Sequence, residues 1–205
     1  MHLISNRIII LLLIRSLSAC GQASNFEDIE KSANQGDALS QALLGEAYVN
    51  GEGVSQDYKK AFEWYIKAAK QGNVDAQNNL GALYANGHGV DEDDKQAFEW
   101  YNKAAKQGNA QAQNNLGAAY ANGEGVIQDY KKAFEWYSKA AEQGNADAQK
   151  YLGFLYEDGS GVTQDYKKAF EWYNKSAEQE NADAQYSLGR IYAIGQGVTQ
   201  DYKKA

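Results

Sequence analysis

The sequence contains few of the residue combinations that catalyse reactions or hold metal ions. The chain has two histidines, His2 and His88, and one cysteine, Cys20. His88 stands alone between two glycines, so the sequence indicates neither a histidine zinc site nor a histidine general base. The chain also lacks the S-x-x-K motif of serine acyl-enzymes. We therefore expect a protein that is not an enzyme and that uses no metal ion or cofactor.

Two further patterns could be taken for ligand sites. The segment NGEGV lacks the third glycine and the Lys-Ser/Thr pair of a phosphate-binding loop. The acids of residues 91–94 lack the twelve-residue pattern of a calcium loop. They fall where a helix is expected to begin, and acids there interact favourably with the helix dipole, so a charged helix start is the favoured interpretation. The formal charge of −7 argues against nucleic acid as a partner.

Residues 1–20 have the features of an export signal. A short basic start ends at Arg7, and seven aliphatic residues follow at 8–14, too few to span a bilayer. Leu17-Ser18-Ala19-Cys20 resembles a bacterial lipobox. The resemblance implies that residues 1–19 are removed and that Cys20 is lipidated, which predicts an exported protein in the periplasm or outer membrane.

Two residues bear on that prediction. Gly21, following the cysteine, resembles the sorting pattern for the outer membrane. Arg15 interrupts the apolar stretch and should weaken entry into the export machinery. The alternatives are an ordinary signal peptide on a secreted protein, or a buried apolar terminus with an incidental cysteine.

The rest of the chain repeats itself. Trp64, Trp100, Trp136 and Trp172 are spaced 36 residues apart, each within the string AFEWY. Such self-similarity predicts a stacked helical array. The expected organisation is a linker and capping helix at 20–39, followed by four full units and a partial fifth. The full units are 40–75, 76–111, 112–147 and 148–183, and the partial unit is 184–205.

Each unit is expected to contain two helices. In the second unit these are 75–85 and 93–106, separated by a loop with two glycines that breaks the helix. Asn73 and Asp93 are suited to cap the two helices. Gly108 follows the second helix, where a left-handed residue is wanted. The fourth unit has Glu180 at the equivalent position, and we expect that helix end to be less tightly capped.

The second helix has an apolar stripe at helical spacing, with charged residues on the opposite side. We interpret the stripe as a packing surface that neighbouring units bury, rather than as a platform for stacking sugars or bases. In the first unit it consists of Ala61, Phe62, Trp64, Tyr65, Ala68 and Ala69.

The full pattern resembles the Sel-1-like repeat family, a relative of the tetratricopeptide repeats, from about residue 26 to 205. In the second unit it reads Leu80-Gly81, Tyr84, Gly87, Gly89-Val90, Asp93, Ala97, Trp100-Tyr101, Lys103-Ala104-Ala105 and Gly108. The resemblance implies an all-α, right-handed superhelical solenoid of 36-residue helix-turn-helix repeats, with the first helix of each unit lining the concave side. The proline often found after GV, and the cysteine pair of some secreted members, are both missing here.

Differences among the copies indicate where a partner could bind. On the first helix, Leu44, Gly45 and Tyr48 recur from unit to unit, whereas neighbouring positions vary and mostly share one face. Large aromatic residues at these variable positions favour a binding surface over a merely solvated one. The candidate groove residues are Asn78, Asn79, Asn114, Asn115, Lys150, Tyr151, Phe154, Tyr186 and Arg190.

The family resemblance implies protein–protein interaction. Together with the export signal, it predicts a cell-envelope scaffold that binds a partner protein or peptide through the concave face. Contact with a membrane is expected only through the lipid anchor. Two alternatives stay open. One is a β-lactamase-like or penicillin-binding hydrolase, as described for cysteine-rich relatives, and the other is a structural spacer.

Overall fold

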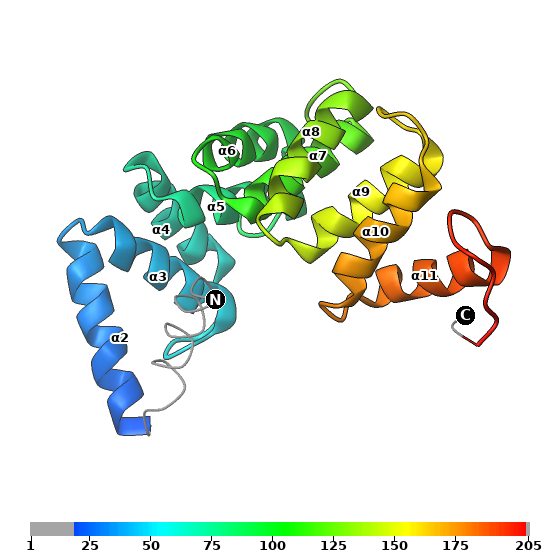
Figure 1. Ribbon diagram of the computed structural model, residues 1–205. Helices are drawn as coiled ribbons and strands as arrows, with labels where there is room; N and C mark the ends of the chain where they lie inside the picture. Colours follow the sequence, from blue (N-terminus) through cyan, green and yellow to red (C-terminus); the bar gives the residue numbers. More distant parts are fainter. Residues whose placement is uncertain (1–18, 204–205) are drawn as a thin grey trace.

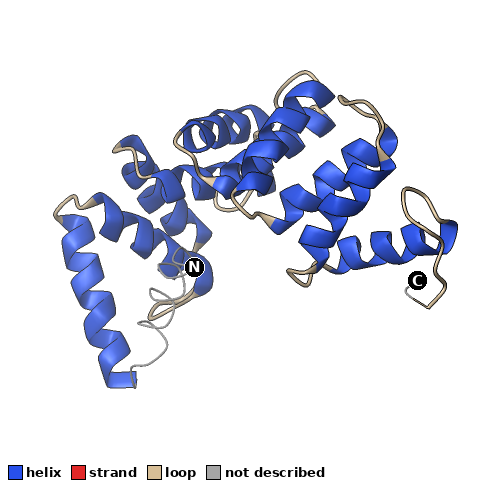
Figure 2. Cartoon of the chain, viewed as in Figure 1, coloured by secondary structure: helices blue, strands red, loops and turns tan. Residues whose placement is uncertain are grey.

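The computed structural model describes residues 19–203, and throughout this range the chain consists of helices and the loops that connect them (Figures 1 and 2). Residues 1–18 and 204–205 lie outside the described range, and with them nearly all of the predicted export signal. The helices are α2 (Ala19–Asn34), α3 (Ala38–Asn50), α4 (Tyr58–Lys70), α5 (Val74–Asn86), α6 (Asp94–Lys106), α7 (Ala110–Asn122), α8 (Tyr130–Glu142), α9 (Ala146–Asp158), α10 (Tyr166–Ala177) and α11 (Ala182–Ile194).

The helices follow one another in antiparallel pairs along an arc from α2 to α11 (Figure 1). The predicted helix 75–85 is α5, and the predicted helix 93–106 is α6, so the expected pairing is confirmed. The side chain of Asn73 accepts a hydrogen bond from the backbone N–H of Ala76 at 2.8 Å. The side chain of Asp93 accepts from the N–H groups of the second and third residues of α6. All-α solenoid architecture is therefore established for the described residues.

A glycine in the first helix of each unit sets how closely the second helix can approach. A Cβ atom added to Gly117 would lie 2.7 Å from the ring of Tyr137, closer than real Cβ atoms come. The glycine therefore lets the ring lie directly on the backbone of α7. This close packing outweighs the roughly 1 kcal/mol by which glycine destabilises a helix. The same contact recurs in the other full units, at Gly45–Tyr65, Gly81–Tyr101 and Gly153–Tyr173.

A second glycine joins consecutive units. Gly125 has φ +67°, and a Cβ there would lie 2.1 Å from the backbone oxygen of Asp94. The loop of one unit thus rests on the first turn of the second helix in the preceding unit. Both the left-handed backbone and the contact require glycine. Equivalent contacts join Gly89 to Tyr58, Gly161 to Tyr130 and Gly197 to Tyr166.

The predicted apolar stripe is only partly buried. Ala61, Tyr65, Ala68 and Ala69 are buried as expected, whereas Trp64 and its equivalents are partly exposed. Phe62 and Trp64 also pack against this core, as the packing interpretation predicts, while each stays partly exposed. Trp136 lies at the seam between units, where it packs on the cluster formed by α6 of the preceding unit and α7 of its own. Its ring is also covered by its own helix, with Lys139 Nζ 4.1 Å from the ring centroid.

Buried glutamines complete the joints between units. Gln113 Nε2 donates to the backbone oxygen of Ala105 at 3.2 Å, and Gln113 Oε1 accepts from Gln143 Nε2 at 2.7 Å. The first bond gives a second donor to a carbonyl in the last turn of α6, which also accepts from the Gly108 N–H at 3.0 Å. Gln41, Gln77 and Gln149 are buried in the same way. Glutamine is usually a surface residue, so composition alone does not reveal this role.

Glu180 adopts the left-handed backbone that glycine provides in the other units. Its φ is +65°, and it is the one described non-glycine residue with positive φ. The helix before it, α10, ends at Ala177 and has 12 residues, where the other second helices have 13. The expected weaker cap at this end is thus confirmed. A side chain in this conformation costs about 1–2 kcal/mol.

Relieving this strain should stabilise the protein. We expect Glu180→Gly to raise the free energy of unfolding by about 1 kcal/mol, because glycine adopts positive φ without penalty but loses more chain entropy on folding. The matched control is Gly144→Ala, at φ +90° with no atom near the added Cβ, which should lower it by a similar amount. Urea unfolding measures both, and equal effects of the same sign would contradict the assignment.

The tyrosines buried against the glycines have raised pKa values. Burial, reinforced by Glu124, raises the pKa of Tyr101 to about 12. Burial also raises the pKa values of Tyr65, Tyr137 and Tyr173. Each of these hydroxyls is therefore neutral at physiological pH, and the unfolded chain releases the tyrosine protons at a lower pH than the folded chain does.

Stability should consequently fall in alkali. The contribution is fully present below the unfolded tyrosine pKa of about 10 and is lost as the pH rises through the higher folded values. We expect Tyr137→Phe to make the fall of the unfolding free energy with pH shallower by up to about 1.4 kcal/mol per pH unit. Urea unfolding at a series of pH values measures the slope. Tyr202→Phe, at an exposed tyrosine, is the control and should leave it unchanged; an equal change there would refute the explanation.

Candidate binding site

Two adjoining cavities open on the surface presented by the first helices of the units, α3, α5, α7, α9 and α11, which we call the A face. The first has a volume of about 350 Å³ and the second about 590 Å³. Phe154, Tyr173 and Ser187 line both cavities, so the two are continuous. Together they form a hollow along α9 and α11, which we call the C-terminal groove.

Aromatic rings form one wall of the groove. Tyr137 of α8 and Tyr151 of α9 stack with their centroids 5.0 Å apart and their planes 22° apart. Phe154, one turn further along α9, is 50% exposed. Tyr137 is itself fixed against Gly117. The wall is therefore a fixed apolar surface that is open to solvent at Phe154.

An ion pair crosses the first cavity from α9 to α11. Lys150 Nζ lies 3.1 Å from Asp183 Oδ2 and 4.3 Å from the centroid of the Tyr151 ring. The lysine side chain is 17% exposed and the aspartate side chain 78% exposed. Burial by itself lowers the pKa of Lys150, but the hydrogen bond to Asp183 and the nearby acids outweigh it and the pKa is raised. The amine is therefore charged, and the carboxylate of Asp183 is the member of the pair that faces solvent.

A second ion pair lines the second cavity. Arg190 Nη2 contacts both carboxylate oxygens of Glu157, at 2.6 Å from Oε2, and the Tyr173 hydroxyl donates to the same Oε2 at 2.9 Å. The Glu157 side chain is only 15% exposed. The hydrogen bond to Glu157 raises the pKa of Arg190 despite partial burial. This cluster ties the fifth unit to the fourth.

The predicted groove residues fall into three groups, which are the residues that line the cavities, Tyr186, and the asparagines. Lys150, Tyr151 and Phe154 line the first cavity, and Phe154 and Arg190 line the second. Tyr186 is 76% exposed on α11 and is not among the lining residues of either cavity.

The asparagines lie elsewhere. Asn78 and Asn114 are buried between units, and Asn115 Nδ2 donates to Asn78 Oδ1 at 3.1 Å. Asn79 Nδ2 donates to the Tyr65 hydroxyl at 3.2 Å and lines a smaller cavity of about 320 Å³ near the N-terminal units. Asn79 and Asn115 both donate to the preceding unit, so the asparagines form a polar joint between units rather than a surface of the C-terminal groove.

The aromatic wall interrupts that joint. By the repeat, Tyr151 occupies the position where Asn115 donates to Asn78. Correspondingly, Asn114 Oδ1 is buried and accepts no hydrogen bond within the described part of the chain. A buried acceptor without a partner costs about 1–3 kcal/mol. Buried polar groups without a partner are uncommon, and this one distinguishes the joint before α9 from the joint between α5 and α7.

Several groove residues were not singled out in the sequence. Tyr137 and Tyr173 appeared only as core residues because they repeat in every unit. Glu157, Asp183 and Ser187 were not chosen as candidates. A usable indication existed for Glu157, because the equivalent positions in other units are Val49, Ala85, Ala121 and Ala193.

None of the helices described here is long and apolar enough to cross a bilayer. Within residues 19–203, no group of three or more His, Cys, Asp or Glu side chains is arranged to hold a metal ion.

Comparison with solved structures shows similar chains in bacteria. A protective antigen of uropathogenic Escherichia coli, c5321, described as displaying an SLR fold, is 44% identical with a TM-score of 0.81; the match covers 86% of this chain and 38% of that chain. A Sel1 repeat protein from Oxalobacter formigenes is 33% identical with a TM-score of 0.80, covering 89% and 78%. The immunity protein Pa5087 from Pseudomonas aeruginosa is 26% identical with a TM-score of 0.58, covering 89% and 70%.

No curated protein matches the sequence significantly. The match to the E. coli antigen spans well under half of that protein's length. The family model described as the Sel1 repeat matches residues 38–73, 74–109, 110–145, 146–181 and 182–205. These spans begin two residues before the units defined above, and they cover most of the chain in an unbroken series. With the paired helices and the recurring glycines described above, they show that the chain belongs to the Sel1 repeat family.

Proposed function

We propose that the protein is a binding scaffold that holds a partner protein or peptide in the C-terminal groove. The observation that carries this proposal is the aromatic wall of Tyr137, Tyr151 and Phe154, whose Tyr151 and Phe154 rings are exposed beside two interhelical ion pairs. Exposed aromatic residues dominate the energies of protein interfaces, and fixed rings lose little entropy on binding. Solenoids select partners through such unit-specific side chains.

The relatives support the proposal at a coarser level. One similar structure is described as a protective antigen and another as an immunity protein, and neither description names an enzymatic activity. Because the chain spans 38% of the antigen's length, no property of that whole protein is carried over. The shared feature is the repeat scaffold, and the groove is this chain's own variation on it.

The side chains of the groove favour binding of a partner over the alternative of a hydrolase. The Tyr137 and Tyr173 hydroxyls have raised pKa values, so neither supplies a phenolate nucleophile or base at physiological pH. Lys150 and Arg190 are charged and held by carboxylates. A pure spacer is the remaining alternative, and it gives no reason for Asn114 to lose its partner at one joint.

We further propose that the protein is exported and anchored by a lipid on Cys20, in the periplasm or outer membrane. The proposal is supported by the lipobox-like Leu17-Ser18-Ala19-Cys20 after an apolar stretch. Cys20 belongs to the first turn of α2, the helix that packs through Phe26 and Ile29 on the first unit. The anchor would thus be joined to the far end of the array from the groove.

Lipid attachment is testable by metabolic labelling. Labelled palmitate should appear in the wild-type protein and be lost in Cys20→Ala, because no other cysteine exists. Expression levels of the two proteins provide the control. Equal labelling of both proteins, or none in either, would refute the anchor and leave the groove proposal intact.

Groove binding is testable by site-specific photocrosslinking in intact cells. A benzoylphenylalanine placed at Phe154 should give a discrete crosslinked product, because that ring lies open between the two cavities. The matched control is the same probe at Ile127, which is exposed on a loop outside the groove. Tyr151→Ala should reduce the product at position 154 about tenfold, as expected for an interface anchor. Identical products from both positions, or none from 154, would support the spacer instead.

A further inference from the structure

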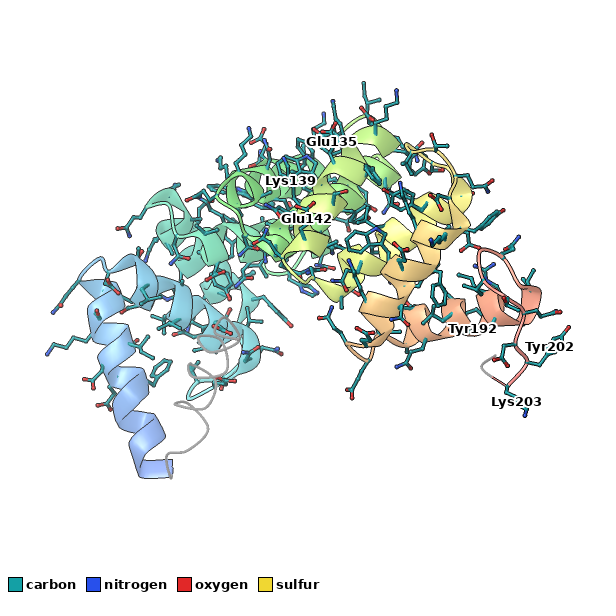
Figure 3. The ribbon with its side chains drawn as sticks, in the orientation of Figure 1. Glu135, Lys139, Glu142, Tyr192, Tyr202 and Lys203 are labelled. Carbon is teal, nitrogen blue, oxygen red and sulfur yellow. The ribbon has the colours of Figure 1, made fainter. Side chains whose placement is uncertain are left out.

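Charge is distributed unevenly between the two helical surfaces. The first helices, α3, α5, α7, α9 and α11, contain six acidic and two basic residues. The second helices, α4, α6, α8 and α10, contain thirteen lysines and six acidic residues. We call the surface of the second helices the B face; Glu135, Lys139 and Glu142 mark it along α8 in Figure 3. The A face is therefore acidic and the B face basic.

Both bases of the A face already have acidic partners. Lys150 is held by Asp183 and Arg190 by Glu157. A third acid, Asp158, is exposed and lines the second cavity, where its carboxylate accepts a hydrogen bond from Ser160. The groove thus contains three acids against two bases. In the Lys150–Asp183 pair the acid faces solvent, whereas Arg190 is the more exposed member of the other pair.

The aromatic rings also favour a positive ligand. Ring faces attract ammonium and guanidinium groups, and Lys150 Nζ already lies over the Tyr151 ring at 4.3 Å. Of the other rings that line this cavity, Tyr130 and Phe154 are exposed, whereas Tyr137 and Tyr173 are buried behind them. An anionic ligand would instead meet Asp158, Asp183 and the electron-rich ring faces.

Resting on the proposed function, we infer that the segment held in the C-terminal groove is a cationic peptide with an aromatic anchor. The anchor side chain packs on Tyr151 and Phe154 in the 350 Å³ cavity. Lysine or arginine side chains on either side of it reach Asp183 and Asp158, which line the first and second cavities respectively. The apolar contact supplies most of the affinity, and the acids select the sign of charge.

Peptide binding to the full chain, measured by fluorescence anisotropy, tests this inference. The probe is a short labelled peptide of alternating arginine and tryptophan. Two comparison peptides replace arginine by aspartate or tryptophan by serine. We expect the arginine–tryptophan peptide to bind at least about tenfold more tightly than either. Its affinity should fall as salt is added, because exposed charges are screened. Equal or tighter binding of the aspartate–tryptophan peptide would overturn the inference.

Matched variants locate the binding. Phe154→Ala should weaken the arginine–tryptophan peptide about tenfold, while Ile127→Ala, which removes an exposed apolar side chain outside the groove, should have little effect. The double variant Asp158→Asn with Asp183→Asn should weaken binding several-fold. Glu135→Gln with Glu171→Gln makes the same change of net charge on the B face and should not. Equal losses from both double variants would mean general attraction to an acidic protein and would refute the site.

Two further readouts separate the possible failures. Circular dichroism checks that each variant keeps its helices. We expect that it does, because all the substituted side chains except Phe154 are surface charges or the loop residue Ile127. Sedimentation of the free protein detects a second copy of the chain; a dimer that the peptide dissociates would assign the groove to self-association and overturn the inference. Crosslinks at Phe154 without binding of the cationic peptide would refute only the charge assignment, whereas absence of crosslinks would refute the groove itself.

Discussion

The contact between a helix glycine and a buried tyrosine ring determines the geometry of every full unit. Because Gly117 has no side chain, Tyr137 lies on the backbone of α7, and the first and second helices pack at the distance set by the thickness of the ring. Tyrosine also buries its hydroxyl in this position, which raises its pKa. Alanines and leucines around it then fill the remaining space, so the core consists mainly of these side chains packed about the tyrosine ring.

A glycine contact also determines how the units stack. A loop glycine seats each unit on the helix start of the preceding unit, and a buried glutamine bridges the helix ends. These contacts connect only neighbouring units, so the array's stability is approximately a sum of local terms. Side chains that take part in none of these contacts are free to differ between copies. That freedom allows α9 and α11 to carry aromatic and charged residues where α5 and α7 carry asparagine and alanine.

The C-terminal groove shows what such a departure costs. Placing Tyr151 where the pattern has asparagine creates a stacked pair with Tyr137, but it leaves Asn114 Oδ1 without a hydrogen bond. At the next joint along the array, the ion pairs Lys150–Asp183 and Glu157–Arg190 connect α9 to α11. The fourth and fifth units are therefore joined partly by residues that also face the groove. Binding there would act directly on the joint between these units.

The sequence by itself determined the period, the helix pairs and their caps, because these depend on local propensity and on spacing along one chain. Repetition also identified Tyr151, Phe154, Lys150 and Arg190 as unusual among the copies. Only the tertiary structure decided which unusual residues meet, since contact across units depends on how helices stack. It placed Glu157 beside Arg190, buried Asn78 and Asn114, and left Trp136 partly exposed at a seam. Spacing reveals which face of a helix a residue occupies, but the distance to the next helix, set here by glycine, decides whether that face is core, joint or groove.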